Sequence, residues 1–287
     1  MKAVIKHELN TYFKSLTAYV FGAFLLAFVG IGAMLYNIQA SVSNFEYVLS
    51  FCSMVFVVIV PILTMKTLAD EKRQKTDQLL YSLPISTTEV VVGKFLSLLV
   101  VFLIPMAIIA IYPLIFARFG DVYLPTAYGS MAAFFIMGAG LIALGIFISS
   151  LTDNQGFAAG IGIAIILLNY FSVSLSEYVS STTLGSLIAI AVVIVLIGLI
   201  VATVTKDKFI GYCTAMVLGI ATIVTYMIDK TKFEGILPNV MSKLSFFERF
   251  TEFVNGVFDW TSIVFYCSAI ALFLFLAVQV LEKRRYN

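Results

Sequence analysis

Charged residues are scarce in this chain of 287 residues: Asp, Glu, Lys and Arg make up 12% of it, against about a quarter of a typical soluble domain. Hydrophobic residues make up 61%, and the mean hydropathy is +1.03. This composition excludes an ordinary soluble domain. The net charge of +2 is also too small to indicate nucleic-acid binding. The sequence therefore predicts an all-α integral membrane protein.

Cysteine and histidine are also rare. Cys52, Cys213 and Cys267 lie inside apolar runs without paired spacing, which favours small core hydrophobes over a disulfide or a metal site. His7 is the single histidine and has no Cys nearby. We therefore expect His7 to lie at the surface, with a metal or proton-relay role as the alternative.

Several functional motifs are missing. The sequence has no GxxxxGK[ST] phosphate loop, so any energy from ATP must come from another chain. It has no HExxH motif and no paired mid-membrane Asp, which argues against intramembrane catalysis. No charged side chain lies at the middle of an apolar run, which argues against proton- or sodium-driven transport.

Long apolar runs are abundant. A helix needs about 20 apolar residues to cross a bilayer, and the chain contains eight such runs. We expect about eight transmembrane helices, forming a single transmembrane domain over residues 1–287. The expected spans are 17–36, 47–65, 95–117, 128–149, 156–175, 184–204, 209–228 and 261–281.

Lysine and arginine lie mainly on one side of these spans. Cytoplasmic loops of membrane proteins are rich in these residues, so this side is expected to be cytoplasmic. Both termini lie on it. The inner group is found in residues 1–16, 66–94, 206–208 and 282–285.

Two segments outside the spans predict helices along the membrane surface. Residues 1–16 place apolar side chains on one helical face, which predicts an N-terminal interfacial helix. The outer loop 229–260 has aromatic residues at helical spacing, which predicts an amphipathic helix at the outer interface. This outer helix is expected either to close the mouth of a pathway or to be a passive connector.

The densest charge lies in residues 66–94. Its pattern predicts a cytoplasmic surface helix from Asp70 to Leu83, which Pro84 ends. Ser86 and Glu89 then form a capping box that begins the next span.

Features inside the spans predict bends and close packing. Pro61, Pro105 and Pro113 are expected to kink the second and third spans. Gly156 and Gly160 form a small face for helix packing, within the chain or across a dimer.

Asn169 and Tyr170 are the most polar pair deep in a span. They are expected either to line a pathway or to make a hydrogen bond between helices.

Three stretches resemble one family. The first holds Glu71-Lys72, Thr76, Leu79-Leu80, Leu83-Pro84-Ile85-Ser86, Glu89 and Gly93-Lys94-Phe95. The second is the turn Ser149-Ser150-Leu151-Thr152-Asp153-Asn154-Gln155, and the third runs from Phe246 to Glu282-Lys283-Arg284-Arg285. Together they resemble ABC-2 type export permeases, especially the branch associated with gliding motility and nitrous-oxide-reductase maturation.

The resemblance implies a permease of the bacterial cytoplasmic membrane that works with cytoplasmic ABC ATPase subunits and a second permease, in contact with membrane lipid. ATP and Mg would be bound by the partner ATPase. The helix from Asp70 to Leu83 would be the coupling helix that contacts this ATPase. The implied contact residues are Asp70, Glu71, Lys72, Arg73, Thr76, Asp77, Leu79, Leu80 and Pro84, with Thr152, Asp153 and Asn154 near a second contact.

The family core has six spans, two fewer than expected here. An inserted hairpin, residues 184–228, explains the difference.

The leading hypothesis is the transmembrane subunit of an ATP-driven exporter. The alternative is a non-transporting membrane scaffold that holds a cytoplasmic partner; a secondary transporter and a lipid-modifying enzyme rank behind both. Under the leading hypothesis, reversing the charges of Glu71 and Asp77 is expected to uncouple ATP hydrolysis from transport without unfolding the chain.

Overall fold

The computed structural model of the protein describes residues 1–76, 85–178 and 236–286, with seven single residues between 191 and 226. It is 84% helix. Up to residue 116 the chain forms α1 (Lys2–Lys14), α2 (Leu16–Gly32), the π-helical η1 (Ala33–Gln39), α3 (Glu46–Ser53), α4 (Phe56–Thr64), α5 (Ala69–Gln74), α7 (Thr87–Ile109) and α8 (Tyr112–Phe116). It continues with α9 (Leu124–Leu151), α10 (Gln155–Tyr178), α13 (Ile236–Leu244), α14 (Phe246–Val254) and α15 (Trp260–Tyr286).

The chain divides into two compact units. Unit 1 contains residues 1–170 and 246–287, and unit 2 contains residues 171–245. Within unit 2 the structure describes the last turns of α10 and the helix α13, which has strongly separated polar and apolar faces.

Six helical stretches match six of the eight expected spans. Five helices are long and apolar enough to cross a membrane, and α3 with residues 56–74 makes a sixth if this bent pair is one span. The remaining expected spans, 184–204 and 209–228, lie outside the described residues except for single positions. The fold is therefore consistent with a membrane helix bundle, while the inserted hairpin 184–228 and the count of eight stay predictions.

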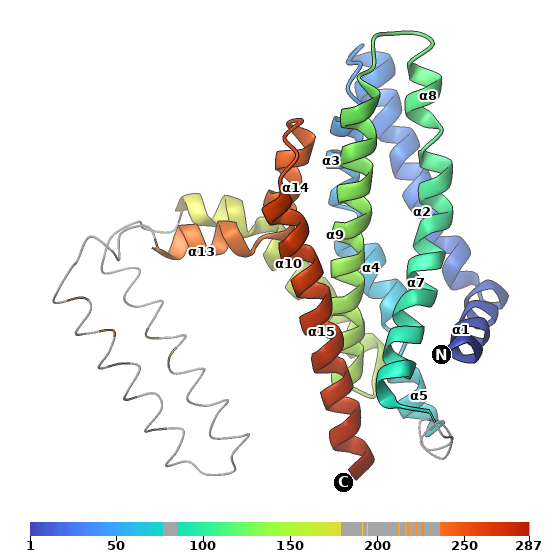
Figure 1. Cartoon of the computed structure of the whole chain (residues 1–287), viewed down its shortest axis with the longest axis vertical. Helices are drawn as coiled ribbons and strands as arrows, with labels where there is room; N and C mark the ends of the chain where they lie inside the picture. The colour runs from blue at the N-terminus through green and yellow to red at the C-terminus, as the bar shows by residue number, and fades with distance from the viewer. Residues whose placement is uncertain are drawn as a thin grey trace. The chain divides into compact units, whose positions relative to one another are not determined.

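Helix α9 is the centre of unit 1. In its most apolar window 78% of the residues are buried, against 17–39% in the other four single-helix spans. Glycines allow this packing, since an added Cβ at Gly138 would lie 2.5 Å from Phe102 and one at Gly145 would lie 2.2 Å from Thr64. Figure 1 shows α9 running between α7 and α15.

The bend expected at Pro61 lies several residues before it, and Pro105 lies inside α7 without a break. The second span bends by 60° between Ser53 and Phe56, ahead of Pro61, which lies inside α4. The third span breaks between α7 and α8, just before Pro113. Pro113 is the second residue of α8, a position where proline is tolerated because its missing N–H would have no partner inside the helix.

Helix α14 buries its apolar face in the protein. Phe246, Phe247, Phe250 and Phe253 are all buried, and the Phe250 ring lies 5.7 Å from that of Phe134 on α9. The amphipathic helix expected in residues 229–260 is thus present, and its interfacial location stays a prediction.

The two described cysteines lie in different environments, and Cys213 lies outside the described residues. Cys52 is buried as expected, but Cys267 is exposed on α15. The expectation of a core position was wrong for Cys267 because one face of this long apolar helix is uncovered, and such a face is what lipid would contact.

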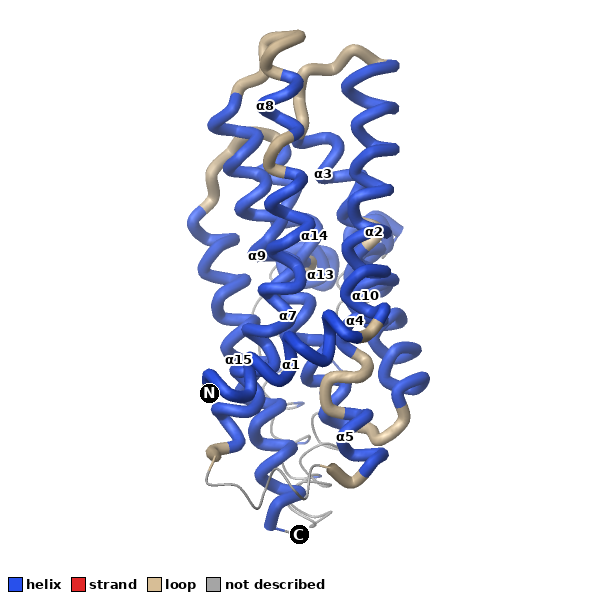
Figure 2. Tube along the Cα trace, turned by 90° about the vertical axis from the view of Figure 1, so that its right-hand side faces the viewer, coloured by secondary structure: helices blue, strands red, loops and turns tan. Residues whose placement is uncertain are grey.

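Both termini of the described chain lie at the same end of unit 1 (Figures 1 and 2). Helix α1 packs along the beginning of α7, where Val4 lies 3.0 Å from the position of an added Cβ on Gly93. This common end agrees with the expected even number of spans; the side of the membrane on which it lies stays a prediction.

Candidate functional site

The end of unit 1 that carries both termini gathers polar side chains from five parts of the chain, and we call it the polar end. Every stretch that carried the family resemblance contributes to it. The polar end comprises Glu8 and Tyr12 of α1, residues 65–76, Thr87 and Lys94 of α7, residues 149–155, and residues 282–284 of α15.

A buried ion-pair group lies at its centre. The Lys94 ammonium donates to Glu8 Oε1 at 2.7 Å and to Glu71 Oε1 at 2.6 Å. The Lys94 side chain is 1% exposed, that of Glu8 is 11% exposed and that of Glu71 is 24% exposed. Since an isolated buried charge is costly, the two carboxylates are what make the burial of this ammonium tolerable. We call these three residues the ionic triad.

A second contact joins α1 to the start of α5. The Tyr12 hydroxyl and the Thr67 hydroxyl lie 3.3 Å apart, and both residues are buried. Burial, opposed by this hydrogen bond, raises the pKa of Tyr12 from 10.0 to about 12. Tyr12 is therefore a neutral hydrogen-bonding group at any physiological pH.

Ser149 fixes the beginning of α5. Its hydroxyl accepts hydrogen bonds from the backbone N–H groups of Leu68 at 3.1 Å and Ala69 at 3.0 Å, and donates to the Met65 carbonyl at 3.2 Å. The first N–H groups of a helix have no partners inside that helix, so a side chain on α9 completes the N-terminus of α5.

Two further side chains tie α5 to the turn between α9 and α10. The buried Lys72 ammonium donates to the Ser150 carbonyl, and Gln155 donates to the Asp70 carboxylate. Asp70 and Lys72, predicted to contact an ATPase, are thus held against another part of this chain.

Only a short part of this segment is left exposed to a partner. Arg73, Gln74, Lys75 and Thr76 are all exposed. The predicted helix from Asp70 to Leu83 is wrong in extent, because α5 ends at Gln74 and Lys75 follows with φ 57°, a left-handed conformation that stops a helix. The predicted contact residues Asp77, Leu79, Leu80 and Pro84 lie outside the described residues.

The turn between α9 and α10 lies beside α5. Asn154 begins α10 by accepting from Gly156 N at 2.9 Å, and Thr152 accepts from Asn154 N at 3.2 Å. Asp153 accepts from Arg284 of α15 at 2.7 Å. Asn154 and Thr152 therefore shape the turn, and Asp153 joins it to the last helix.

The start of α7 confirms one prediction in part. The Ser86 hydroxyl accepts from Glu89 N at 3.2 Å, as the expected capping box requires. Glu89 itself lies 3.7 Å from the N-terminal amine of Met1. Thr87 donates to Glu282 of α15 at 2.8 Å, which links the first turn of α7 to the last helix.

Sequence reasoning missed half of this network. The sequence analysis did not single out Glu8, and it named Lys94, Ser149 and Gln155 only within the stretches that carry the family resemblance. One signal was available for Lys94, because a lysine followed directly by a long apolar run must find a partner as it enters the bundle. Nothing in the sequence identified Glu8 as that partner.

Two predicted features of α10 have structural partners. Asn169 accepts from Phe246 N at 2.9 Å, which is the expected hydrogen bond between helices, and the Tyr170 ring lies 5.0 Å from that of Phe247. An added Cβ at Gly160 would meet nothing within 4 Å. The close contact on this helix is instead at Gly162, where an added Cβ would lie 3.0 Å from Pro61 Cβ. Packing of Gly160 across a dimer stays a prediction.

The opposite end of unit 1 is aromatic rather than ionic. Phe258 lies between Phe253 and Trp260, with ring centroids 5.8 and 5.1 Å away, and Trp260 is exposed. We call this region, together with Tyr123 and the pocket beside it, the aromatic end. Exposed Trp and Tyr side chains are typical of a membrane–water interface.

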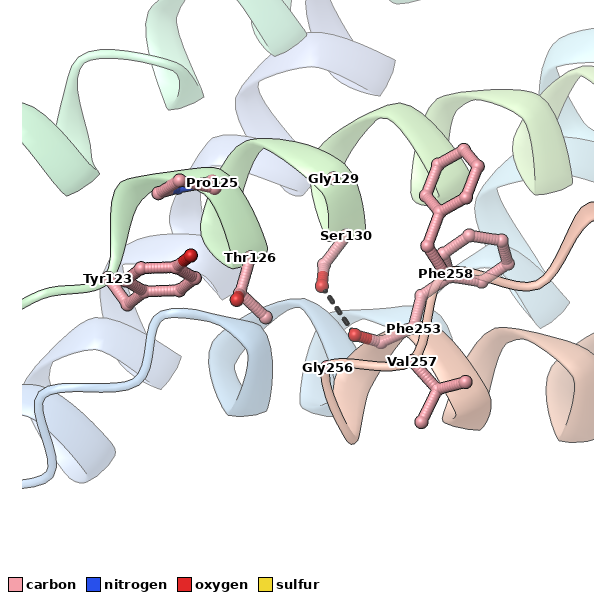
Figure 3. A pocket seen from close by; sticks show the side chains of 9 residues that line it. All are labelled: Tyr123, Pro125, Thr126, Gly129, Ser130, Phe253, Gly256, Val257 and Phe258. Carbon is pink, nitrogen blue, oxygen red and sulfur yellow. Dashed lines mark hydrogen bonds between the residues drawn. The ribbon is translucent and has the colours of Figure 1, made fainter.

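The pocket at the aromatic end has a cavity volume of about 290 Å³. Figure 3 shows the start of α9 on one side of it and the segment after α14 on the other. The Ser130 hydroxyl crosses between them and donates to the Phe253 carbonyl at 2.8 Å. The nine lining residues are uncharged: Tyr123, Pro125, Thr126, Gly129, Ser130, Phe253, Gly256, Val257 and Phe258.

No site for a metal is evident in the part of the chain that the structure describes, since no three His, Cys, Asp or Glu side chains gather there. The chemistry of the polar end is instead that of ion pairs and hydrogen bonds between helices.

Comparison with known proteins gives one positive finding. Residues 33–174 match the model of the ABC-2 family transporter protein, a region that includes α5 and the turn between α9 and α10. A search of the curated proteins found no match. The match supports an ABC-2 type permease, which is a transporter membrane component and not itself catalytic, in a multi-pass membrane protein.

Proposed function

We propose that this chain is the permease subunit of an ATP-driven ABC exporter and that separate ATP-binding subunits dock at its polar end. ATP and Mg²⁺ are bound by those partners, and a second permease, identical or homologous, completes the pathway. The chain lies in the bacterial cytoplasmic membrane with both termini on the cytoplasmic side. Within the family, the proposal places it in the gliding-motility and nitrous-oxide-reductase-maturation branch.

One observation carries the proposal. Residues 65–76 and 149–155 are about 80 positions apart in the sequence, as the 81- and 80-residue separations of Leu68 and Ala69 from Ser149 show, yet they form one hydrogen-bonded surface. Both stretches carry the family resemblance, and both lie inside the matched region. A surface assembled from two loops, with Arg73 to Thr76 exposed beside it, suits a docking partner.

The polar end also has the charge that a cytoplasmic face needs. Its lysines and arginines include Lys66, Arg73, Lys75, Lys283 and Arg284, and the positive-inside rule favours the cytoplasm for such a face. The hydrogen bonds of α5 provide a route for force, because a push on α5 acts directly on α9 through Ser149.

The experiment is to extract the tagged full chain gently from its native membrane and identify what copurifies in stoichiometric amount. The variant Arg73→Glu is compared with Arg118→Glu, which reverses an equally exposed arginine between α8 and α9. We expect a P-loop ATPase with the wild type and with Arg118→Glu, and at least about tenfold less of it with Arg73→Glu, since like charges at a docking surface cost several kcal/mol. Equal retention by both variants would contradict docking at α5.

The charge reversal of Glu71 that the sequence suggested is better made at another residue. Reversing Glu71 would place a second ammonium beside the buried Lys94, so a folding defect would hide any uncoupling. Arg73 is exposed and free of that complication.

A membrane scaffold is the alternative outcome. If an ATPase copurifies but no added compound changes its ATP hydrolysis in a reconstituted membrane, the chain anchors the partner without transporting. Substrate-stimulated hydrolysis would support the exporter.

A further inference from the structure

An apolar groove runs along the surface of unit 1 between α2 and α4. Its cavity volume is about 160 Å³, and seven of its eight lining residues are apolar. Phe21, Ile59 and Leu63 are buried and form its floor, whereas Phe24 and Val58 are exposed and form parts of its edges. An open apolar groove on a membrane-spanning helix pair faces the hydrocarbon of the bilayer.

One end of this groove reaches the polar end of unit 1. Thr17, its single polar lining residue, lies in the first turn of α2, and Leu63 lies in the last turn of α4. From Thr17 to Phe24 the helix rises about 10 Å, at 1.5 Å per residue. The groove is therefore long enough for part of an extended acyl chain, and it begins where the polar end stops.

Two lysines lie at that end of the groove, one on each side of it. Lys14 is the last residue of α1, three positions before Thr17, and Lys66 follows shortly after α4. The hydroxyls of Tyr12 and Thr67 lie 3.3 Å apart, so the end of α1 packs against the segment that follows α4. Both lysine side chains are exposed.

The carboxylates closest to these lysines in the sequence bond to other groups. Glu8 and Glu71 accept from Lys94, and Asp70 accepts from Gln155. In the part of the chain that the structure describes, neither ammonium at the end of the groove has an ion-pair or hydrogen-bond partner. An anion at the membrane surface would complement these two charges.

We propose that the groove binds one anionic phospholipid, with an acyl chain along the groove and the phosphate head group between Lys14 and Lys66. The acyl chain exchanges one apolar environment for another, so the groove supplies shape but little preference among lipids. The preference comes from the two ammonium groups, each of which favours an anionic head group about fivefold. A second permease is the weaker candidate for an occupant, because protein packed over this end would bury both charges without a phosphate to pair them.

The test is photo-crosslinking of the purified full chain in lipid nanodiscs, without any ATPase. The probe is a phosphatidylglycerol with a diazirine in the first half of one acyl chain, compared with a phosphatidylcholine that carries the same chains. Mass spectrometry quantifies the labelling of residues 17–24 and 58–63, with the apolar part of α15 as the reference. The double variant Lys14→Gln with Lys66→Gln is matched by Lys2→Gln with Lys6→Gln, which removes the same charge from exposed positions of α1.

We expect phosphatidylglycerol to label the groove at least about tenfold more than phosphatidylcholine does, once both are normalised to α15, because the two lysines act together. The variant of Lys14 and Lys66 should lose this preference, and the variant of Lys2 and Lys6 should keep it. As a second readout, Val58→Phe places a ring at the edge of the groove and should lower the labelling of residues 17–24 by both lipids. Val264→Phe, at an exposed position of α15, should not.

Equal labelling ratios in the groove and on α15 would overturn the proposal, and so would a preference that survives the loss of Lys14 and Lys66. Labelling of the groove by both lipids far below that of α15 would overturn it as well, since a second permease would then cover the groove. None of these results depends on an ATPase copurifying, so this proposal and the proposed function fail separately.

Discussion

Helix α9 is held at its two ends by different chemistry. At the polar end its Ser149 hydroxyl makes three hydrogen bonds and Lys94 lies buried nearby between two carboxylates. At the aromatic end its Ser130 hydroxyl makes one hydrogen bond, beside a pocket lined by uncharged residues. The polar end joins five segments of the chain through hydrogen bonds and ion pairs, whereas the aromatic end contains a pocket. Under the proposed function, force would enter at the polar end, and the pocket at the aromatic end would leave room for a change of shape.

Removal of the triad ammonium should have the largest effect. Lys94→Met leaves Glu8 and Glu71 facing each other in the interior, so we expect a loss of about 3–5 kcal/mol in unfolding free energy. Denaturant unfolding of the purified chain in detergent measures it. Lys6→Met, an exposed position on α1, is the control and should cost less than about 0.5 kcal/mol. Equal losses in both variants would mean that the triad contributes no more than surface charge.

Ser149 and Ser130, near the two ends of α9, give a matched comparison of those ends. Ser149→Ala leaves the N–H groups of Leu68 and Ala69 without an acceptor, at a cost of about 2–4 kcal/mol. Ser130→Ala frees a single carbonyl, Phe253, and should cost about 1 kcal/mol. The same unfolding assay ranks them. The reverse order would show that the aromatic end is the tighter joint.

Two glycines of α9 test the packing. An added Cβ would lie 2.2 Å from Thr64 Oγ1 at Gly145 but would meet nothing within 4 Å at Gly129. We expect Gly145→Ala to cost about 1–3 kcal/mol through overpacking. Gly129→Ala should be neutral or slightly stabilising because alanine favours the helix by about 0.5–1 kcal/mol. If both substitutions behave alike in thermal unfolding, the contrast between the ends does not extend to packing.

The smallest expected effect is a pH dependence at the aromatic end. Asp259 caps α15, and hydrogen bonds from Ser262 and Thr261 lower its pKa from 3.8 to about 2. Because the folded pKa lies below the unfolded one, the stabilisation is complete above about pH 4 and is lost as the pH falls toward 2. The unfolding temperature of the wild type relative to Asp259→Asn should therefore fall over that interval. A difference that stays constant with pH would show that the charge of Asp259 does not matter.

Part of the fold could be predicted from the sequence. Apolar length alone located the six described spans, because hydropathy over about 20 residues is a direct physical requirement of the bilayer. The start of α7 at Ser86 was predictable because a capping box is a local pattern. The end of α5 at Gln74 was not, since lysine favours a helix and Lys75 takes the left-handed conformation in which glycine is the usual residue.

The candidate site was only half predictable for the same reason. The motifs indicated that Asp70, Glu71 and Lys72 matter, but Gln155, Lys94 and Ser150, which bond to their side chains, are distant in the sequence. No local pattern reports a contact between segments that are 23 to 85 positions apart. Among the predicted contact residues, the structure thus distinguishes Asp70 and Lys72, which bond to other parts of the chain, from the exposed Arg73 and Thr76.

The most direct test of the account is site-specific photo-crosslinking in intact cells from two exposed positions at opposite ends of unit 1. A photo-reactive amino acid is placed at Gln74, at the end of α5, or at Phe119, beside α8. We predict a crosslink to a P-loop ATPase from position 74 and none from position 119. A crosslink from position 119 alone, or from neither position while the protein is folded in the membrane, would contradict docking at the polar end.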